Sequence, residues 1–222
     1  MLQLREKEII SLLKSLSNFD FVVIGGYAVN AYTLPRFSVD CDIVLKKRND
    51  RIEKILKDQG YKLTGSEKNT VYGGEFLRFE KTLENNFKVS MDILIKEVLD
   101  RQTNVVFKAD WIFKNSSLRL LKGKTITEES RLRIIDLNAL VVMKFISCRN
   151  TDIRDVFMLM PKANKEWVRK EVSARCDFME RFSKIKNKIV SEKFKDDLQG
   201  VYGYIDENVF EKHKKAILDI LC

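Results

Sequence analysis

Apolar and polar positions alternate differently in the two parts of this chain. Before about residue 134, short β-branched and aromatic runs are interspersed with helically spaced stretches, and beyond it every apolar pattern repeats at i, i+3 and i+4. The sequence therefore predicts an α+β fold. A mixed β-sheet with flanking helices is expected in residues 1–134, followed by an all-helical part in residues 135–222.

The elements follow from these patterns. We expect strands at 21–25, 39–45, 71–81, 87–95, 117–121 and 131–137, with the polar residues 82–86 forming a hairpin loop. Helices are predicted in the first part at 4–16, 26–34 and 97–116, with another between Asn49 or Asp50, either of which is a suitable cap, and Gly60. In the second part helices are predicted at 138–149, 152–160, 164–174, 177–198 and 206–221.

Composition narrows the classes of protein. The 222 residues are 45% hydrophobic and 33% charged, which is ordinary for a globular protein with a substantial core. No run approaches the length of a membrane-spanning segment, and the charged N-terminal stretch does not resemble a signal peptide. Four cysteines without metal-type spacing and one histidine predict reduced thiols, a cytoplasmic location and no zinc site. The net charge of +9 suits polyanions such as nucleotides and RNA, and solubility alone explains it equally well.

Three aspartates stand in apolar strands, where a buried carboxylate needs a partner. Asp40 and Asp42 are two residues apart and therefore share a face of one predicted strand, and Asp92 lies inside another. If the strands are neighbours, the carboxylates converge and suit Mg²⁺, which prefers oxygen ligands. Such a set, together with a nucleotide phosphate, could hold two ions.

The pair Gly25–Gly26 ends the first strand and opens the next helix. Glycine permits a tight turn and close approach of a ligand, and a helix start offers N–H groups to a phosphate. A G-G pair alone is common in tight turns, and D-x-D alone occurs on exposed edge strands. Their combination, with a third strand aspartate, favours a functional site.

This combination resembles the DNA polymerase β-like nucleotidyltransferase superfamily. The stretch IGGYAVNAYTLPRFSVDCDIVL is most similar to AbiEii-type and related small prokaryotic nucleotidyltransferases, including Arg36 and Ser38 just before D-x-D. A later segment, LNALVVMKFISCRNTDIRDVFML, also resembles that family. The resemblance covers about residues 21–160.

The resemblance implies roles for particular residues. Asp40, Asp42 and Asp92 would be the catalytic metal ligands, for two Mg²⁺ ions or Mn²⁺ in their place. The residues implied in nucleotide binding are Gly25, Gly26, Arg36, Ser38, Lys144, Asp152 and Asp155. The family often has Lys directly before D-x-x-D, where this chain has Thr151, so Arg149 or Arg154 would substitute.

The residues of the second part also have ordinary explanations. Lys144 follows an apolar helical run, and it either contacts the ligand or extends to solvent. Asp152 and Asp155 share a helix face, and the alternatives are a helix cap at Asp152 and a surface ion pair at Asp155.

The predicted activity is transfer of an NMP from an NTP to an acceptor hydroxyl. The helical part would close the active-site cleft. The resemblance permits RNA, particularly a tRNA end, a small molecule or a protein as acceptor, and an antitoxin as partner. The rival hypothesis is a non-catalytic nucleotide- or RNA-binding module on the same scaffold.

Two further glycine motifs are interpreted structurally. The sequence KGKT at 122–125 lacks the first glycine of a P-loop, because Leu118 stands at that position, so a hairpin turn is predicted. Gly73–Gly74 is interpreted as a bulge or turn beside a strand.

Overall fold

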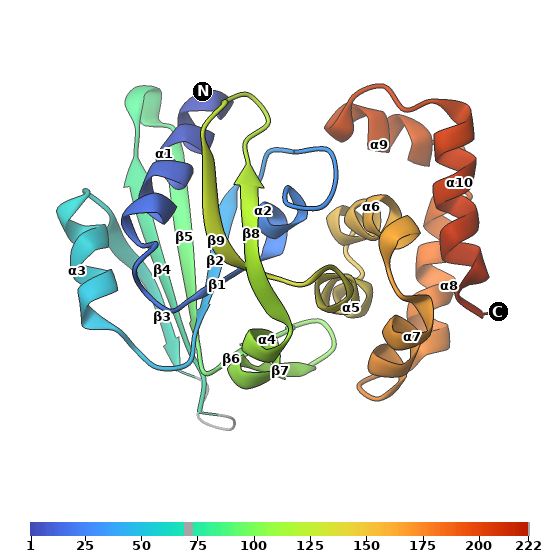
Figure 1. The fold of residues 1–222 in the computed structure, drawn as a ribbon, viewed down its shortest axis with the longest axis horizontal. Helices are drawn as coiled ribbons and strands as arrows, with labels where there is room; N and C mark the ends of the chain where they lie inside the picture. The colour runs from blue at the N-terminus through green and yellow to red at the C-terminus, as the bar shows by residue number, and fades with distance from the viewer. Residues whose placement is uncertain (69–72, 222) are drawn as a thin grey trace. The chain divides into compact units, whose positions relative to one another are not determined.

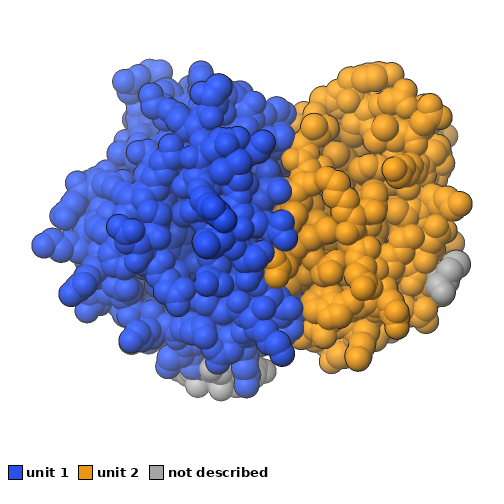
Figure 2. Space-filling view, in the orientation of Figure 1, with its two compact units in different colours: residues 1–31, 35–99, 106–135 blue, residues 32–34, 100–105, 136–222 orange. Residues whose placement is uncertain are grey.

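The computed structural model describes residues 1–68 and 73–221. The chain divides into two compact units, which Figure 2 colours separately. Unit 1 contains residues 1–31, 35–99 and 106–135, and unit 2 contains residues 32–34, 100–105 and 136–222. Two short segments from the first part of the chain are therefore integrated into unit 2.

Unit 1 is built on a mixed seven-stranded sheet in the order β3-β4-β5-β2-β1-β9-β8 (Figure 1). The pairs β2–β5 and β1–β9 are parallel, and the other neighbours are antiparallel. The strands are β1 Val22–Ile24, β2 Asp40–Leu45, β3 Lys62–Lys68, β4 Glu75–Thr82, β5 Lys88–Ile95, β8 Ser116–Lys122 and β9 Glu129–Ile135. A second, two-stranded sheet joins β6 Glu97–Leu99 to β7 Val106–Lys108.

The helices of unit 1 are short apart from the first. They are α1 Leu2–Ser15, α2 Gly25–Val29, α3 Asp50–Asp58, α4 Ala109–Lys114 and the 3₁₀ turn η1 Glu84–Asn86. Helix α1 packs against β5 and β9 through buried residues such as Ile9 and Leu13. The Asn49 side chain accepts a hydrogen bond from Arg51 N and caps α3, as one of the two predicted alternatives required.

Unit 2 is entirely helical in its regular structure, which confirms the predicted α+β class with a helical C-terminal half. Its elements are α5 Leu137–Ser147, α6 Asn150–Leu159, η2 Met160–Lys162, α7 Lys165–Ser173, α8 Phe178–Ile189, α9 Phe194–Tyr202, α10 Glu207–Leu218 and η3 Asp219–Leu221. None of the helices in the described residues is long and apolar enough to span a membrane.

An aromatic cluster forms the centre of unit 2. Phe157 lies 5.1 Å from both Phe194 and Phe210 between ring centroids. Proline at position 161 has no N–H to donate to the Phe157 carbonyl four residues earlier. The His213 imidazole supplies that hydrogen bond from Nδ1 at 3.0 Å. A carbonyl oxygen can only accept, so Nδ1 carries the proton, and burial lowers the pKa of His213.

Several sequence-based expectations for individual elements were wrong. No helix spans 97–116, because Asp100 accepts hydrogen bonds from Gln102 N and Thr103 N and closes a turn between β6 and β7. Helix 26–34 ends at Val29, and the single helix expected at 177–198 is two helices, α8 and α9. Strand β3 was not predicted, since its sequence KLTGSEK has no apolar alternation. Of the strand expected at 71–81, residues 71 and 72 lie outside the described residues.

The KGKT segment encloses a carboxylate of unit 1. Glu6 of α1 is 2% exposed and accepts hydrogen bonds from Thr125 N and Thr125 Oγ1, both at 2.8 Å, and from Lys124 N. This segment connects the antiparallel strands β8 and β9, as the predicted hairpin turn requires. The turn and the N-terminal helix therefore stabilise each other.

We predict that Glu6→Ala lowers the free energy of unfolding by about 2 kcal/mol, because it removes the buried carboxylate that accepts three hydrogen bonds from Lys124 and Thr125. Urea unfolding followed by circular dichroism measures the change. Lys7→Ala is the matched control, since Lys7 is exposed on the same helix. Equal losses for the two variants would contradict the role given to Glu6.

Candidate active site

The side chains of the three predicted aspartates project from one face of the sheet in unit 1. Strands β2 and β5 are parallel neighbours, with Asp42 directly opposite Asp92 and Asp40 directly opposite Ser90. Directly paired residues project to the same face, and so do residues two apart on one strand. Asp92 is 5% exposed, whereas Asp40 and Asp42 are half-buried. The Ser90 hydroxyl donates a hydrogen bond to Asp40 Oδ1.

The glycine pair lies against the same aspartate strand. Gly25 has φ +64°, and a Cβ there would overlap Asp42 Oδ2 and lie 2.9 Å from Asp42 Cγ. A Cβ at Gly26 would overlap Ser38 Oγ and lie 3.2 Å from a terminal guanidinium nitrogen of Arg36. Both positions therefore require glycine for close approach, and Gly25 also requires it for its backbone angle.

The loop before D-x-D has a defined conformation. The Asn30 side chain donates to Arg36 O and accepts from Arg36 N, both at 3.0 Å, so it fixes the backbone of Arg36 from both sides. The Arg36 guanidinium also donates to Phe37 O at 3.0 Å. Within unit 1, the structure thus brings together Gly26, Arg36 and Ser38.

Arg78, which pairs with the third aspartate, was not among the predicted site residues. Arg78 lies directly opposite Asp92 on the antiparallel strand β4. Its Nε donates to Asp92 Oδ1 at 2.8 Å and its Nη2 to Asp92 Oδ2 at 2.7 Å. The same Nη2 is 3.7 Å from Asp40 Oδ1. The alternation of Leu77, Arg78 and Phe79 was the available signal, because it places a charge on one face of a half-buried strand.

Charge and burial act in opposite directions on Asp92. Burial raises the pKa of Asp92 above its usual range, and the hydrogen bond and charge of Arg78 act to lower it. The pairing with Asp92 raises the pKa of Arg78, so the guanidinium stays charged.

The side chains of this site are of the type that binds a divalent cation, but they are not arranged around one. Carboxylate oxygens are the ligands that Mg²⁺ prefers, and three of them arise on one face. However, within residues 1–68 and 73–221 no group of three or more His, Cys, Asp and Glu side chains is arranged to hold a metal ion. Both oxygens of Asp92 are instead occupied by Arg78. Asp40 and Asp42 could hold an ion, and Asp92 could join them once Arg78 withdraws.

The predicted residues of the helical half form a buried network in unit 2. Lys144 Nζ lies 2.8 Å from Asp152 Oδ1 and 2.8 Å from Asp155 Oδ2. Tyr202 Oη donates to Asp155 Oδ1 at 2.7 Å, and Asp152 Oδ2 accepts from Arg149 N. Lys144 is 7% exposed and Asp155 is 0% exposed. The alternatives of a solvent-extended Lys144 and a surface pair at Asp155 are therefore wrong. A nucleotide contact by these residues stays a prediction.

No local pattern pointed to Tyr202, because it is 47 residues from its partner Asp155. Arg149, named above as a substitute for the family lysine, has its Nη2 3.4 Å from Asp100 Oδ2. The network thus extends from α6 to α9 and to the segment 100–105.

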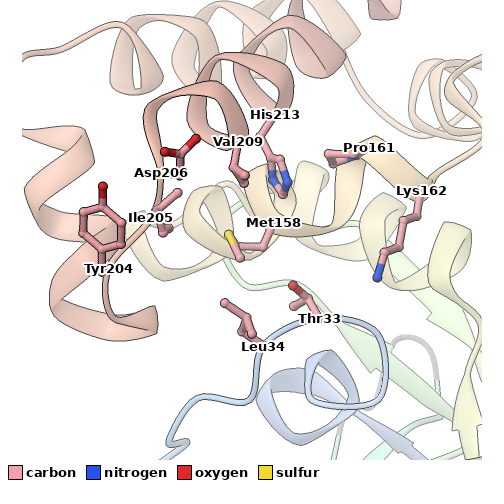
Figure 3. A pocket seen from close by; sticks show the side chains of 10 residues that line it. All are labelled: Thr33, Leu34, Met158, Pro161, Lys162, Tyr204, Ile205, Asp206, Val209 and His213. Carbon is pink, nitrogen blue, oxygen red and sulfur yellow. The ribbon is translucent and has the colours of Figure 1, made fainter.

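Unit 2 also contains an open pocket of about 410 Å³. Figure 3 shows Met158, Lys162, Tyr204 and His213 among the side chains that line it. Lys162 Nζ donates to Tyr32 O at 2.7 Å. The walls of the pocket are mainly apolar, and none of the residues predicted to be functional lines the pocket.

Comparisons with known proteins bear on the fold. No family model and no curated protein matches this chain. Among solved structures, it is similar to the crystal structure of a "putative nucleotidyltransferase" from H. pylori, with a TM-score of 0.57 and 13% sequence identity. The match covers 99% of this chain and 94% of the other. This chain therefore has a nucleotidyltransferase-like fold, and the closer resemblance to AbiEii-type proteins stays a prediction.

We predict that Gly25→Ala destabilises the protein by at least about 1 kcal/mol, because a side chain disfavours the positive φ and would displace Asp42. Thermal and urea unfolding measure the loss. Gly200→Ala is the matched control, since Gly200 lies within α9 with open space where a Cβ would be, and alanine favours a helix. A Gly25→Ala protein as stable as the wild type would contradict the close approach.

Lys144→Met should lower the free energy of unfolding by about 3–5 kcal/mol, because it leaves two buried carboxylates without their cation. Tyr202→Phe should remove about 1 kcal/mol, the contribution of one hydrogen bond. Lys170→Met, at an exposed lysine of α7, serves as control in the same urea titration. If Lys144→Met lost no more than Lys170→Met, the network would not be a stabilising feature.

Proposed function

We propose that this protein is a Mg²⁺-dependent nucleotidyltransferase that moves an NMP from an NTP to an acceptor hydroxyl. The observation that supports it most is the row of carboxylates on β2 and β5 beside the Gly25–Gly26 turn. The nucleotidyltransferase-like fold is consistent with this activity.

Each residue of unit 1 has a defined part in the proposed reaction. Asp40 and Asp42 would hold Mg²⁺, or Mn²⁺, with a second ion on Asp92, and the metal would neutralise charge on the triphosphate. The backbone N–H groups of the Gly25–Gly26 turn would contact the phosphates, and Arg36 supplies a permanent positive charge next to Gly26.

The chemical step exchanges one P–O bond for another. The acceptor oxygen forms a bond to the α-phosphorus while the bond from that phosphorus to the β-phosphate oxygen breaks, and pyrophosphate leaves. Asp92 would receive the proton of the acceptor hydroxyl as general base, or would instead hold the ion that activates this hydroxyl. Ser90 orients Asp40 through its hydrogen bond.

For the acceptor, we propose RNA first, including a tRNA end, because the net charge of +9 favours a polyanion. A small hydroxylated molecule and a protein side chain are the other acceptor classes. A toxin role with an antitoxin partner is part of the same proposal, and so are a cytoplasmic location and closure of the site by the helical half.

One observation favours a second candidate, a nucleotide-binding module without chemistry. Arg78 already neutralises Asp92, so the site can remain stable without two metal ions. This module would bind NTP and leave any acceptor unmodified.

A transfer assay tests the proposal. Purified protein, Mg²⁺ and each α-labelled NTP are incubated with total RNA, with aminoglycosides or with protein alone. We expect label to move to one acceptor class. Asp40→Asn/Asp42→Asn should reduce the rate by about 1,000-fold or more, because it removes ligands that act on the transferring phosphate.

The matched control is Asp58→Asn/Asp196→Asn, which removes the same charge at two exposed positions and should keep full activity. Metal-dependent NTP binding without any transfer would favour the second candidate. Absence of both binding and transfer would exclude the nucleotidyltransferase.

A further inference from the structure

Arg78, Asp92 and Asp42 form a row across three adjacent strands. Asp92 is the direct partner of Arg78 on β4 and of Asp42 on β2. The β-ladder therefore fixes the guanidinium next to the carboxylate that metal binding would require. Because the contact is bidentate, neither oxygen of Asp92 is without a strong donor.

The Arg78 guanidinium and a divalent ion cannot both bind Asp92 tightly at the same time. A guanidinium is permanently charged, and a divalent ion on Asp92 would lie within a few ångströms of it. Like charges at that separation repel strongly in a partly buried site, where water screens them poorly. The Asp92 side chain is 7% exposed, so this repulsion applies here.

We propose that Arg78 competes with divalent metal for Asp92, so that the site takes one ion on Asp40 and Asp42 while Arg78 stays paired and a second only when it withdraws. This inference rests on the proposed function. Arg78 is then a specificity-determining residue, because its position sets the number of ions that the carboxylates hold. Its Nη2 lies 3.7 Å from Asp40, so its withdrawal also changes the charge around the first ion.

Mn²⁺ binding to the full chain, measured from the electron paramagnetic resonance signal of the free ion, tests this proposal. At mildly alkaline pH and low salt, Arg78→Gln should bind Mn²⁺ about tenfold more tightly than the wild type, or bind one additional ion. The rise in thermal unfolding midpoint caused by Mn²⁺ should be correspondingly larger. Arg78→Met is a second neutral variant and should behave in the same way.

Two variants serve as controls. Arg78→Lys keeps the positive charge and should stay close to the wild type in Mn²⁺ affinity. Arg131→Gln removes the same charge at an exposed position of β9, which is separated from β5 by β1 and β2. If Arg131→Gln tightened binding as much as Arg78→Gln, general charge would be the cause and the proposal would fail.

The remaining outcomes separate this inference from the proposed function. Unchanged Mn²⁺ affinity and stoichiometry in Arg78→Gln, with clear binding to the wild type, would overturn the competition and leave the metal-dependent transferase intact. A stability loss alone would assign Arg78 a purely structural pairing. No Mn²⁺ binding to the wild type, Arg78→Gln or Arg78→Met would overturn both.

Discussion

The parallel pairing of β2 with β5 is the constraint on which the candidate site depends. Its register puts Asp42 beside Asp92 and Asp40 beside Ser90. A slip of one residue would send the β2 aspartates to the opposite face, where Cys41 and Ile43 are now fully buried. The apolar residues of β2 therefore fix the position of its charged ones. The Gly25–Gly26 turn depends on the antiparallel register of β1 with β2, which pairs Ile24 with Asp42, because Asp42 fills the space that a side chain at Gly25 would need.

Much of this arrangement could be predicted from the sequence, because it is encoded locally. Two aspartates two residues apart in an apolar strand share a face wherever that strand lies. Glycines after a strand and Pro35 before the next strand limit the intervening segment. The helical half could be predicted equally well, since the change in the spacing of apolar residues is visible in the sequence without any knowledge of contacts. The convergence of Asp42 and Asp92 was expected on the condition that the two predicted strands are neighbours, and their direct pairing depends in addition on the register.

The parts that could not be predicted depend on register and on distance along the chain. A hairpin loop at 82–86, as expected, would pair Asp92 with Phe76. The observed strands extend to the pair Thr82 and Lys88, and this shift brings Arg78 opposite Asp92 instead. A difference of two residues thus replaces an aromatic partner by a cation without changing which face is buried. The prediction of a helix at 97–116 was wrong for another reason. The hydrogen bonds that Asp100 accepts in a turn outweigh the helical spacing of the apolar residues around it.

The assignment of residues 100–105 to unit 2 has a consequence for biosynthesis. Asp100 accepts a hydrogen bond from Ser147 and lies 3.4 Å from the Arg149 guanidinium, and both partners follow the last strand of the sheet. As the chain leaves the ribosome, the hairpin β6–β7 emerges well before these two partners. Asp100 must then remain satisfied by Thr103 and water while the seven-stranded sheet is completed by β9. Asp100 therefore gains its Ser147 and Arg149 partners only after the last strand of the sheet has been synthesised.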